Sequence, residues 1–235
     1  MDIEFSSTVD VELVKDSASD LDVARAAWVS TKGQDARESA SDRLAGLINY
    51  LMRDRHGSPF EHAQFTFFIS APIFVFREFH RHRAGWSYNE ESGRYTTLKP
   101  RFYVVGDERP LQQVGKPGAY QFEAGTYAQI KGVQGQQRRI AVEAYHAYEK
   151  MLADGVAREV ARMVLPTSIY SSMYASCNAR SLMHFLSLRT TAPEASVPSF
   201  PQLEIAMDGD KLEGIFAGAM PKTYGAWVLN GRVAP

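Results

Sequence analysis

Hydrophobic and polar residues in the N-terminal part of the chain predict two strands and two helices. Residues 9–14 alternate between apolar and polar side chains, as in a half-buried strand, and residues 65–70 are rich in β-forming side chains. Apolar residues recur with helical spacing over residues 39–53, which predicts a helix there. Asp20 or Asp22 is placed to cap an earlier helix.

The middle of the chain alternates between helical patterns and stretches without a period. Pro72 suits the first turn of a helix, which we expect over residues 73–83. Residues 84–106 mix polar and aromatic side chains and predict a loop with short strands. Residues 108–118 contain several prolines and glycines and predict a linker, whereas residues 136–152 have the spacing of a long helix.

The C-terminal part is mostly helical in pattern. We expect a short helix over residues 156–164 and another over residues 178–190. Residues 191–201 contain three prolines and predict irregular structure. Residues 203–220 are amphipathic, with an expected interruption at residues 208–210. Helices mixed with short strands predict an α+β fold with a mixed or antiparallel sheet and several helices, including a long central one.

Length and composition indicate an ordinary globular protein. The chain has 235 residues, of which 45% are hydrophobic and 23% charged, which is enough for one large domain or two small ones. Of these two, we expect a single domain over residues 1–235. The formal net charge of -1 gives no global reason to expect a nucleic-acid coat protein or a membrane-surface binder. Cys177 is the only cysteine, which excludes an internal disulfide and fits a reducing compartment.

No targeting or membrane segment is expected. Residues 1–20 carry six acidic residues and no apolar core of a signal peptide. The longest uncharged run, residues 63–76, has 14 residues, whereas a spanning helix needs about 20 apolar ones. The sequence therefore predicts a cytoplasmic protein.

Residues 77–101 form the most unusual segment. They contain six Lys or Arg against three Glu, a local charge of +3 in a chain of net charge -1. If the expected helix persists, Arg77 and Arg81 share one face with His80 beside them. Clustered cations repel one another unless an anion lies among them, and Arg matches phosphate with planar, paired donors. Residues 92–94, Ser-Gly-Arg, add the parts of an anion-binding nest.

Two simpler interpretations of this segment stay open at this point. The first is a solvated, charged helix end whose arginines pair with glutamates. The second makes His80 and His82 metal ligands, but side chains two residues apart on a helix point in different directions. We therefore expect no metal site.

Two further polar groups stand out among apolar residues. Arg162 lies in an apolar helical stretch, where its stem could simply cover apolar surface while its head reaches water. On the helix expected over residues 178–190, Asn178 and Arg189 fall about 20° apart, whereas Arg180 and His184 fall about 40° apart on nearly the opposite side. One helix would thus contact two ligands or two subunits.

Taken in order, these segments resemble the flavin-dependent thymidylate synthases. The signature is Arg-His-Arg at residues 81–83, followed by Ser-Gly-Arg at residues 92–94. The supporting motifs are Ser-Pro-Phe-Glu-His at 58–62, Ala-Arg at 161–162 before Leu-Pro at 165–166, Asn-Ala-Arg-Ser at 178–181 and Leu-Arg at 188–189. Eight residues separate the two parts of the signature, one more than is usual in the family.

The resemblance implies a homotetramer with FAD at its subunit interfaces. It implies conversion of dUMP to dTMP, with methylenetetrahydrofolate as one-carbon donor and NADPH as reductant of the flavin. The residues implied to touch FAD are Ser58, Arg81, His82, Arg83, Glu90, Asn178, Arg180 and His184. Those implied to hold dUMP are Glu78, Phe79, His80, Arg81, Glu91, Ser92, Gly93, Arg94, Arg162 and Arg189.

Arg189 is the implied catalytic residue, lying against the uracil and favouring its N3-ionised form. A fixed guanidinium lowers the cost of negative charge on the ring. Cys177 lies near an expected helix start, a setting that can activate a thiol, but its apolar neighbours indicate burial. The resemblance implies flavin reduction without an enzyme nucleophile, so we expect Cys177 to be dispensable.

One alternative function comes from a different class. A non-catalytic nucleotide- or RNA-binding module could use residues 77–101, where Trp86, Tyr88 and Tyr95 could stack on bases. That module does not account for the polar groups of residues 178–189 or for a net charge near zero.

Overall fold

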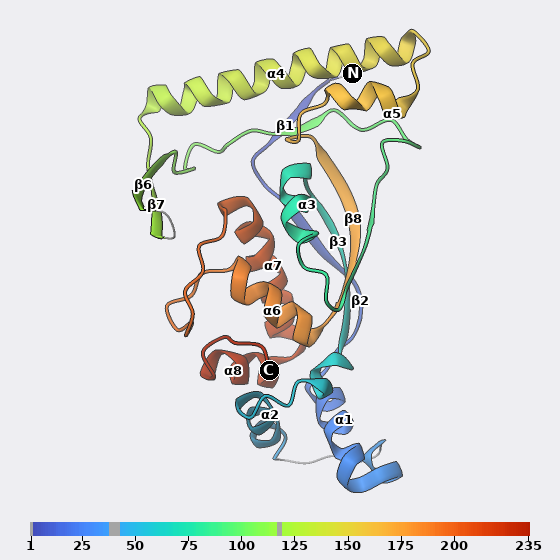
Figure 1. Cartoon of the computed structure of the whole chain (residues 1–235), viewed down its shortest axis with the longest axis vertical. Coiled ribbons are helices and arrows are strands. Elements are labelled where there is room, and N and C mark those ends of the chain that lie inside the picture. Colours follow the sequence, from blue (N-terminus) through green and yellow to red (C-terminus); the bar gives the residue numbers. More distant parts are fainter. Residues whose placement is uncertain (1, 38–42, 117–118) are drawn as a thin grey trace. The chain divides into compact units, whose positions relative to one another are not determined.

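The computed structural model describes residues 2–37, 43–116 and 119–235. Its helices and its mixture of parallel and antiparallel strand pairs confirm the α+β fold (Figure 1). The chain divides into two compact units. Unit 1 comprises Met1–Asp10, Ser70–Phe79 and Glu90–Met173, and unit 2 comprises Val11–Ile69, His80–Asn89 and Tyr174–Pro235. The single-domain organisation stays a prediction.

The largest sheet has the strand order β2-β3-β8-β4. Its strands are β2 (Asp10–Ser17), β3 (Gln64–Pro72), β8 (Tyr170–Asn178) and β4 (Trp86–Glu90). Buried and more exposed side chains alternate along β3 and β8, as expected for strands with one face on a core. The strands expected at residues 9–14 and 65–70 are confirmed, whereas β8 was not anticipated.

Unit 1 is built around an aromatic core beneath a long helix. Strands β1 (Glu4–Ser6) and β5 (Arg101–Tyr103) form a parallel pair in this unit. Helix α4 (Tyr127–Ala153) contributes Tyr145 and Tyr148, whose hydroxyls bond to the backbone of Leu98. The rest of this core is Phe102, Ala141, Ala161 and Ile169.

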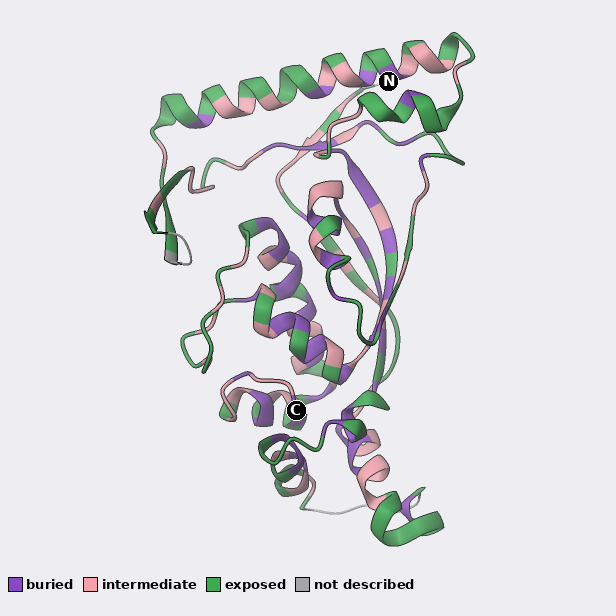
Figure 2. Cartoon of the chain, viewed as in Figure 1, coloured by how far each residue is buried: buried purple, intermediate pink, exposed green. Residues whose placement is uncertain are grey.

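Helix α4 is longer than its apolar pattern predicts. It begins at a capping box, in which Thr126 and Gln129 satisfy each other's backbone N–H groups. Only Ile130, Ala141, Tyr145 and Tyr148 are buried, and most of the remaining surface is exposed or half-exposed (Figure 2). The polar first half carries no apolar stripe, which is why periodicity alone detected only the second half.

The remaining elements of unit 1 are short. They are the helices α3 (Ile73–Phe79), α5 (Arg158–Ala161) and η3 (Arg162–Val164), and the antiparallel pair β6 (Gln112–Lys116) and β7 (Ala119–Glu123). The linker expected at residues 108–118 is therefore wrong where the structure describes it, because residues 112–116 pair with β7. Gly115, with φ of 92°, supports a backbone conformation that other residues rarely adopt.

Unit 2 packs helices around an aromatic cluster. These helices are α1 (Asp20–Lys32), η1 (Gly33–Arg37), α2 (Leu44–Arg53), η2 (Ser58–Glu61), α6 (Ala179–Arg189), α7 (Leu203–Ala219) and α8 (Pro221–Leu229). The ring of Phe216 contacts the rings of Phe65 and Trp227, each at a centroid distance of 6.3 Å. Ser19, not Asp20 or Asp22, caps α1, and residues 39–42 of the second expected helix lie outside the described residues.

Helix α7 continues through the interruption expected at residues 208–210. The Asp-Gly-Asp sequence suggested a break, but Gly209 serves packing: a Cβ there would lie 2.8 Å from the backbone oxygen of Arg189 and from Thr190 Cγ2. The glycine lets α7 lie directly against the end of α6. In the described chain, no helix is both long and apolar enough to cross a membrane.

Helix α3 ends at Phe79, four residues before the predicted end at Arg83. The shared helical face expected for Arg77 and Arg81 is therefore wrong. The chain turns after Phe79 instead of continuing as a helix, and Gly85, with φ of 68°, adopts a backbone conformation outside the helical region.

Candidate functional site

The Arg-His-Arg motif forms a turn beside helix α6 in unit 2. A cavity of about 290 Å³ lies between them. Its lining residues are Arg81, His82, Arg83, Ala84, Trp86, Ser181, His184, Leu188 and Arg189. Three arginines and two histidines thus surround one small volume, an arrangement that favours an anionic ligand.

His82 is the buried centre of this cluster. Arg189 Nε donates a hydrogen bond to His82 Nε2 at 3.0 Å, and the imidazole lies against Phe185 with centroids 4.6 Å apart. Tyr88 Oη donates to the backbone oxygen of His82 at 2.9 Å. Burial, followed by the positive charge of Arg189 and by His184, lowers the pKa of His82 from 6.5 to about 4. His82 is therefore neutral near pH 7 and accepts the bond that orients Arg189.

The N-terminus of α6 fixes the loop that follows the motif. Asn178 Oδ1 accepts from the Ser181 N–H at 2.8 Å and so caps the helix. A Cβ at Gly85 would collide with Ser181 Oγ and would lie 2.9 Å from Asn178 Nδ2. Only glycine permits this approach at a positive φ, so the loop and the helix start hold each other in place.

Arg180 belongs to a different neighbourhood from His184. Its Nη1 pairs with Glu61 at 2.6 Å, and its Nε donates to the backbone oxygen of Pro235 at 2.6 Å. Gly57 accommodates the guanidinium, because a Cβ there would lie 2.6 Å from Arg180 Nε. The expected grouping of Arg180 with His184 is therefore corrected: His184 lines the cavity of Arg189, while Arg180 contacts η2 and the chain end.

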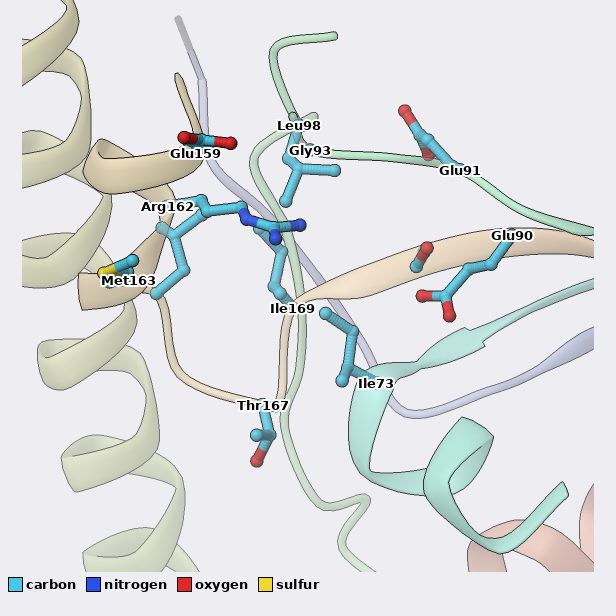
Figure 3. A pocket seen from close by; sticks show the side chains of 12 residues that line it. Ile73, Glu90, Glu91, Gly93, Leu98, Glu159, Arg162, Met163, Thr167 and Ile169 are labelled. Carbon is cyan, nitrogen blue, oxygen red and sulfur yellow. The ribbon is translucent and has the colours of Figure 1, made fainter. Parts of the chain in front are cut away.

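A second cavity, of about 250 Å³, lies within unit 1 (Figure 3). Its lining residues are Ile73, Glu90, Glu91, Gly93, Leu98, Glu159, Arg162, Met163, Leu165, Thr167, Ile169 and Ser171. The guanidinium of Arg162 extends into the middle of this group (Figure 3). Arg162 lines the cavity but is also exposed, so the alternative in which its stem covers apolar surface while its head reaches water stays open.

Backbone packing positions the Ser-Gly-Arg segment at this cavity. A Cβ at Gly93 would lie 3.0 Å from Leu98 Cδ1 and 3.2 Å from Arg162 Cδ, so a side chain there would disturb the cavity wall. Ser92 Oγ accepts from the Arg94 N–H at 3.3 Å. Arg94 Nε lies 3.0 Å from Glu159 Oε2 in an exposed ion pair that contributes little to stability.

Two residues of this cavity escaped the sequence analysis. Glu159 neutralises Arg94 and comes from helix α5. Ser171 is only 3% exposed, and its hydroxyl has no hydrogen-bond partner within the described parts of the chain. The available sequence signal was the alternation that places Met173, Ala175 and Cys177 at every second position after Ser171, but the strand itself was missed.

The other predicted residues occupy varied positions. Glu78 lies half-buried on α3, and the side chain of Phe79 is fully buried against Phe76. The whole residue is 0% exposed, and the dUMP contact at Phe79 stays a prediction. His80 lies beside Tyr88 with ring centroids 5.2 Å apart, and Ser58 begins η2 in an exposed position.

The structure therefore gathers the predicted residues into two groups, each within one unit. Unit 2 holds most of the residues predicted for the flavin, and it also holds Arg189. Unit 1 holds Glu90, Glu91, Gly93 and Arg162 around the second cavity.

Known proteins match this chain along almost its whole length. The family model described as thymidylate synthase complementing protein matches residues 12–220. A protein named flavin-dependent thymidylate synthase from Streptomyces avermitilis is 62% identical over 98% of this chain and 95% of its own. One of the same name from Tropheryma whipplei is 53% identical, covering 100% of this chain and 98% of its own.

The chain is also similar to solved structures in its three-dimensional fold. The UMP/dUMP methylase PolB from Streptomyces cacaoi, bound with 5-Br dUMP, has a TM-score of 0.94 and 50% identity, covering 99% of this chain and 100% of that one. The same methylase bound with 5-Br UMP has a TM-score of 0.92 and 48% identity. With the motifs, the family model and the full-length relatives in agreement, the chain belongs to the flavin-dependent thymidylate synthase family.

Proposed function

We propose that this protein is a flavin-dependent thymidylate synthase that converts dUMP to dTMP. Methylenetetrahydrofolate supplies the one-carbon unit, and NADPH supplies the reducing equivalents through bound FAD. The observation that carries the proposal is the conjunction of Arg189, oriented by neutral His82, with a cationic cavity in a chain of this family. FAD, when bound, supplies the hydride that completes the methyl group.

The residues of the first cavity fit the anionic part of FAD. Arg81, Arg83 and His184 surround a volume of about 290 Å³ and offer charged donors suited to a pyrophosphate. Asn178, Ser58, Glu90 and Arg180 are proposed to complete the flavin site, with His82. Arg81 also serves dUMP in this assignment.

The residues around the second cavity fit a nucleotide monophosphate. Arg162 and Arg94 offer guanidinium groups, while Ser92 and Gly93 offer a hydroxyl and an unobstructed backbone N–H. Glu78, Phe79, His80 and Glu91 are proposed to complete the dUMP site.

Arg189 is the proposed catalytic residue. Its guanidinium stabilises negative charge on the uracil ring, which makes C5 more nucleophilic toward the one-carbon unit. The bond to His82 limits the rotation of Arg189, so the cation is held in place before substrate arrives. Protein residues thus bind, orient and polarise, and no enzyme nucleophile is required.

We further propose that the protein works in the cytoplasm as a homotetramer with active sites at subunit interfaces. It is the assembly that the resemblance to the family implies. Neither a nucleic acid nor a membrane is needed as a partner.

The deciding experiment supplies purified, flavin-loaded protein with dUMP, methylenetetrahydrofolate and NADPH and measures dTMP by chromatography. We expect product only when all three are present, together with the absorbance of bound oxidised flavin before reduction. UMP replaces dUMP in a parallel assay, because the solved relative is named for both nucleotides. Binding of dUMP without flavin and without product would support the nucleotide-binding module instead.

A further inference from the structure

A third cavity lies in unit 2 and involves none of the residues assigned to FAD or dUMP. Its volume is about 630 Å³, within the range of roughly 300–1,000 Å³ typical of small-molecule sites. Helix α1 and the 3-10 helix η1 supply most of its wall, with Ser17 from β2 and His62 from the end of η2.

The charged groups of this cavity are mainly cationic. Two arginines, Arg25 and Arg37, line it against a single carboxylate, that of Asp22, together with His62. Asp22 already accepts a hydrogen bond from Ser19 Oγ at 2.6 Å. The arginines therefore leave an excess of positive charge at the cavity.

An anion in this cavity would stabilise the side chain of Arg25. Its Nε is buried and has no hydrogen-bond acceptor within residues 2–37, 43–116 and 119–235. A partly buried guanidinium without an acceptor costs free energy, and an oxyanion in the adjoining cavity would offset that cost. Ala26, Val29 and Ala36 complete an apolar wall of small side chains that leaves room for a ligand.

Two substrates of the proposed reaction have no assigned site, and both carry anions. NADPH has a phosphate on its adenosine ribose, and the folate has the carboxylates of its glutamate tail. Planar guanidinium groups match either oxyanion with paired donors. We propose that this cavity binds the anionic end of one of these two co-substrates through Arg25 and Arg37, an inference that rests on the proposed function.

The test compares Arg25→Gln and Arg37→Gln with wild type in the flavin-loaded protein. Lys32→Gln is the matched control, because it removes a positive charge from the same helix without lining the cavity. Flavin reduction is followed separately with NADPH and with NADH, which lacks the ribose phosphate. Binding of adenosine 2′,5′-bisphosphate and of 5′-AMP is measured by calorimetry, without turnover.

Two results would support the proposal and would identify the ligand. If the phosphate binds there, kcat/KM for NADPH and affinity for the bisphosphate fall about ten- to a hundredfold, while NADH and 5′-AMP are unaffected. If the glutamate tail binds there, nucleotides are unaffected and KM for methylenetetrahydrofolate rises by a similar factor, more for the triglutamate form than for the monoglutamate.

Unchanged constants for both co-substrates would overturn the proposal, as would equal losses in Lys32→Gln. Arg37 is exposed in η1, so Arg37→Gln remains informative if Arg25→Gln does not fold. Failure of the proposed function is a separate result, since wild-type protein would then make no dTMP.

Discussion

At the residue scale, buried His82 accepts the hydrogen bond that orients Arg189 and also makes stability depend on pH. Its pKa in the folded protein, about 4, lies below the value of 6.5 expected in the unfolded chain. Between those values the unfolded chain binds the proton and the folded protein does not. Stability therefore falls as pH decreases from about 6.5 toward 4, by at most about 1.4 kcal/mol per pH unit.

His82→Gln should flatten this acid dependence. A glutamine amide oxygen can still accept from Arg189 Nε, but it cannot titrate. Thermal melts of flavin-free protein between pH 4 and 7 provide the measurement, with exposed His146→Gln as the control that should keep the wild-type slope. A His82→Gln slope equal to wild type would show that this histidine does not carry the effect.

Burial decides whether Cys177 is an activated thiol or an inert core residue. The thiol is 1% exposed, and burial raises its pKa well above the ordinary value, so almost no thiolate forms near neutrality. Cys177→Ala should keep most dTMP formation, with a stability loss of about 1 kcal/mol from lost packing. Product is measured under saturating substrates; a folded variant that binds FAD and dUMP yet makes no dTMP would contradict the mechanism.

Asn178 has a structural role that must be separated from its proposed flavin contact. It caps α6, so Asn178→Ala should destabilise the protein by about 1 kcal/mol, whereas Asn178→Ser keeps a capping oxygen. Denaturant titrations of flavin-free protein measure this difference. If the amide also binds FAD, both variants lose flavin affinity; equal stability of the two variants would refute the capping role.

At the element scale, the approach of α7 to α6 depends on one glycine. A Cβ at Gly209 would lie 2.8 Å from the backbone oxygen of Arg189, a contact that real side chains do not tolerate. Gly209→Ala should therefore lower stability by about 1–3 kcal/mol and displace the end of α6 that carries Arg189.

Gly214→Ala is the matched control on the same helix. Apart from its chain neighbours and the backbone of its own helix, no atom of the described residues lies within 4 Å of a Cβ at that position, so alanine should stabilise α7 by up to about 1 kcal/mol. Melting temperature and kcat are measured for both variants. Equal effects of the two substitutions would show that packing at Gly209 is not special.

Sequence patterns located elements where burial follows a simple period. The strand at β3 and the helix at α6 were confirmed, because each has one clear apolar face. The pattern failed where tertiary contacts override local preference. The Asp-Gly-Asp sequence around Gly209 predicted a helix break, but the glycine serves a packing contact. The residues after Phe79 continued the helical pattern in sequence, yet the chain turns there and Gly85 has a positive φ.

At the scale of the whole molecule, the site could be predicted only as an ordered set of motifs. Residues 81–83 and 178–189 are far apart in sequence, yet His82 and Arg189 are 3.0 Å apart at their nitrogens. Nothing in local periodicity encodes that bond. Ser171 and the cavity of Arg25 went undetected for the same reason, since their significance lies in burial and in missing partners among the described residues.

The proposed tetramer leads to a complementation experiment. Arg83→Ala should impair the proposed flavin group of unit 2, and Arg162→Ala should impair the proposed dUMP group of unit 1. Each variant alone should be nearly inactive. If one active site takes these two arginines from different chains, random mixed tetramers contain intact sites at about a quarter of positions.

Mixing after mild dissociation and reassembly should therefore restore about a quarter of wild-type dTMP formation. Light scattering before and after mixing checks that tetramers re-form, and a mixture of Arg162→Ala with itself controls for recovery on reassembly. If tetramers re-form without recovery, both arginines of a site come from one chain. A flavin-loaded monomer that is fully active would refute sites shared between chains, because every residue of the reaction would then be present in a single subunit.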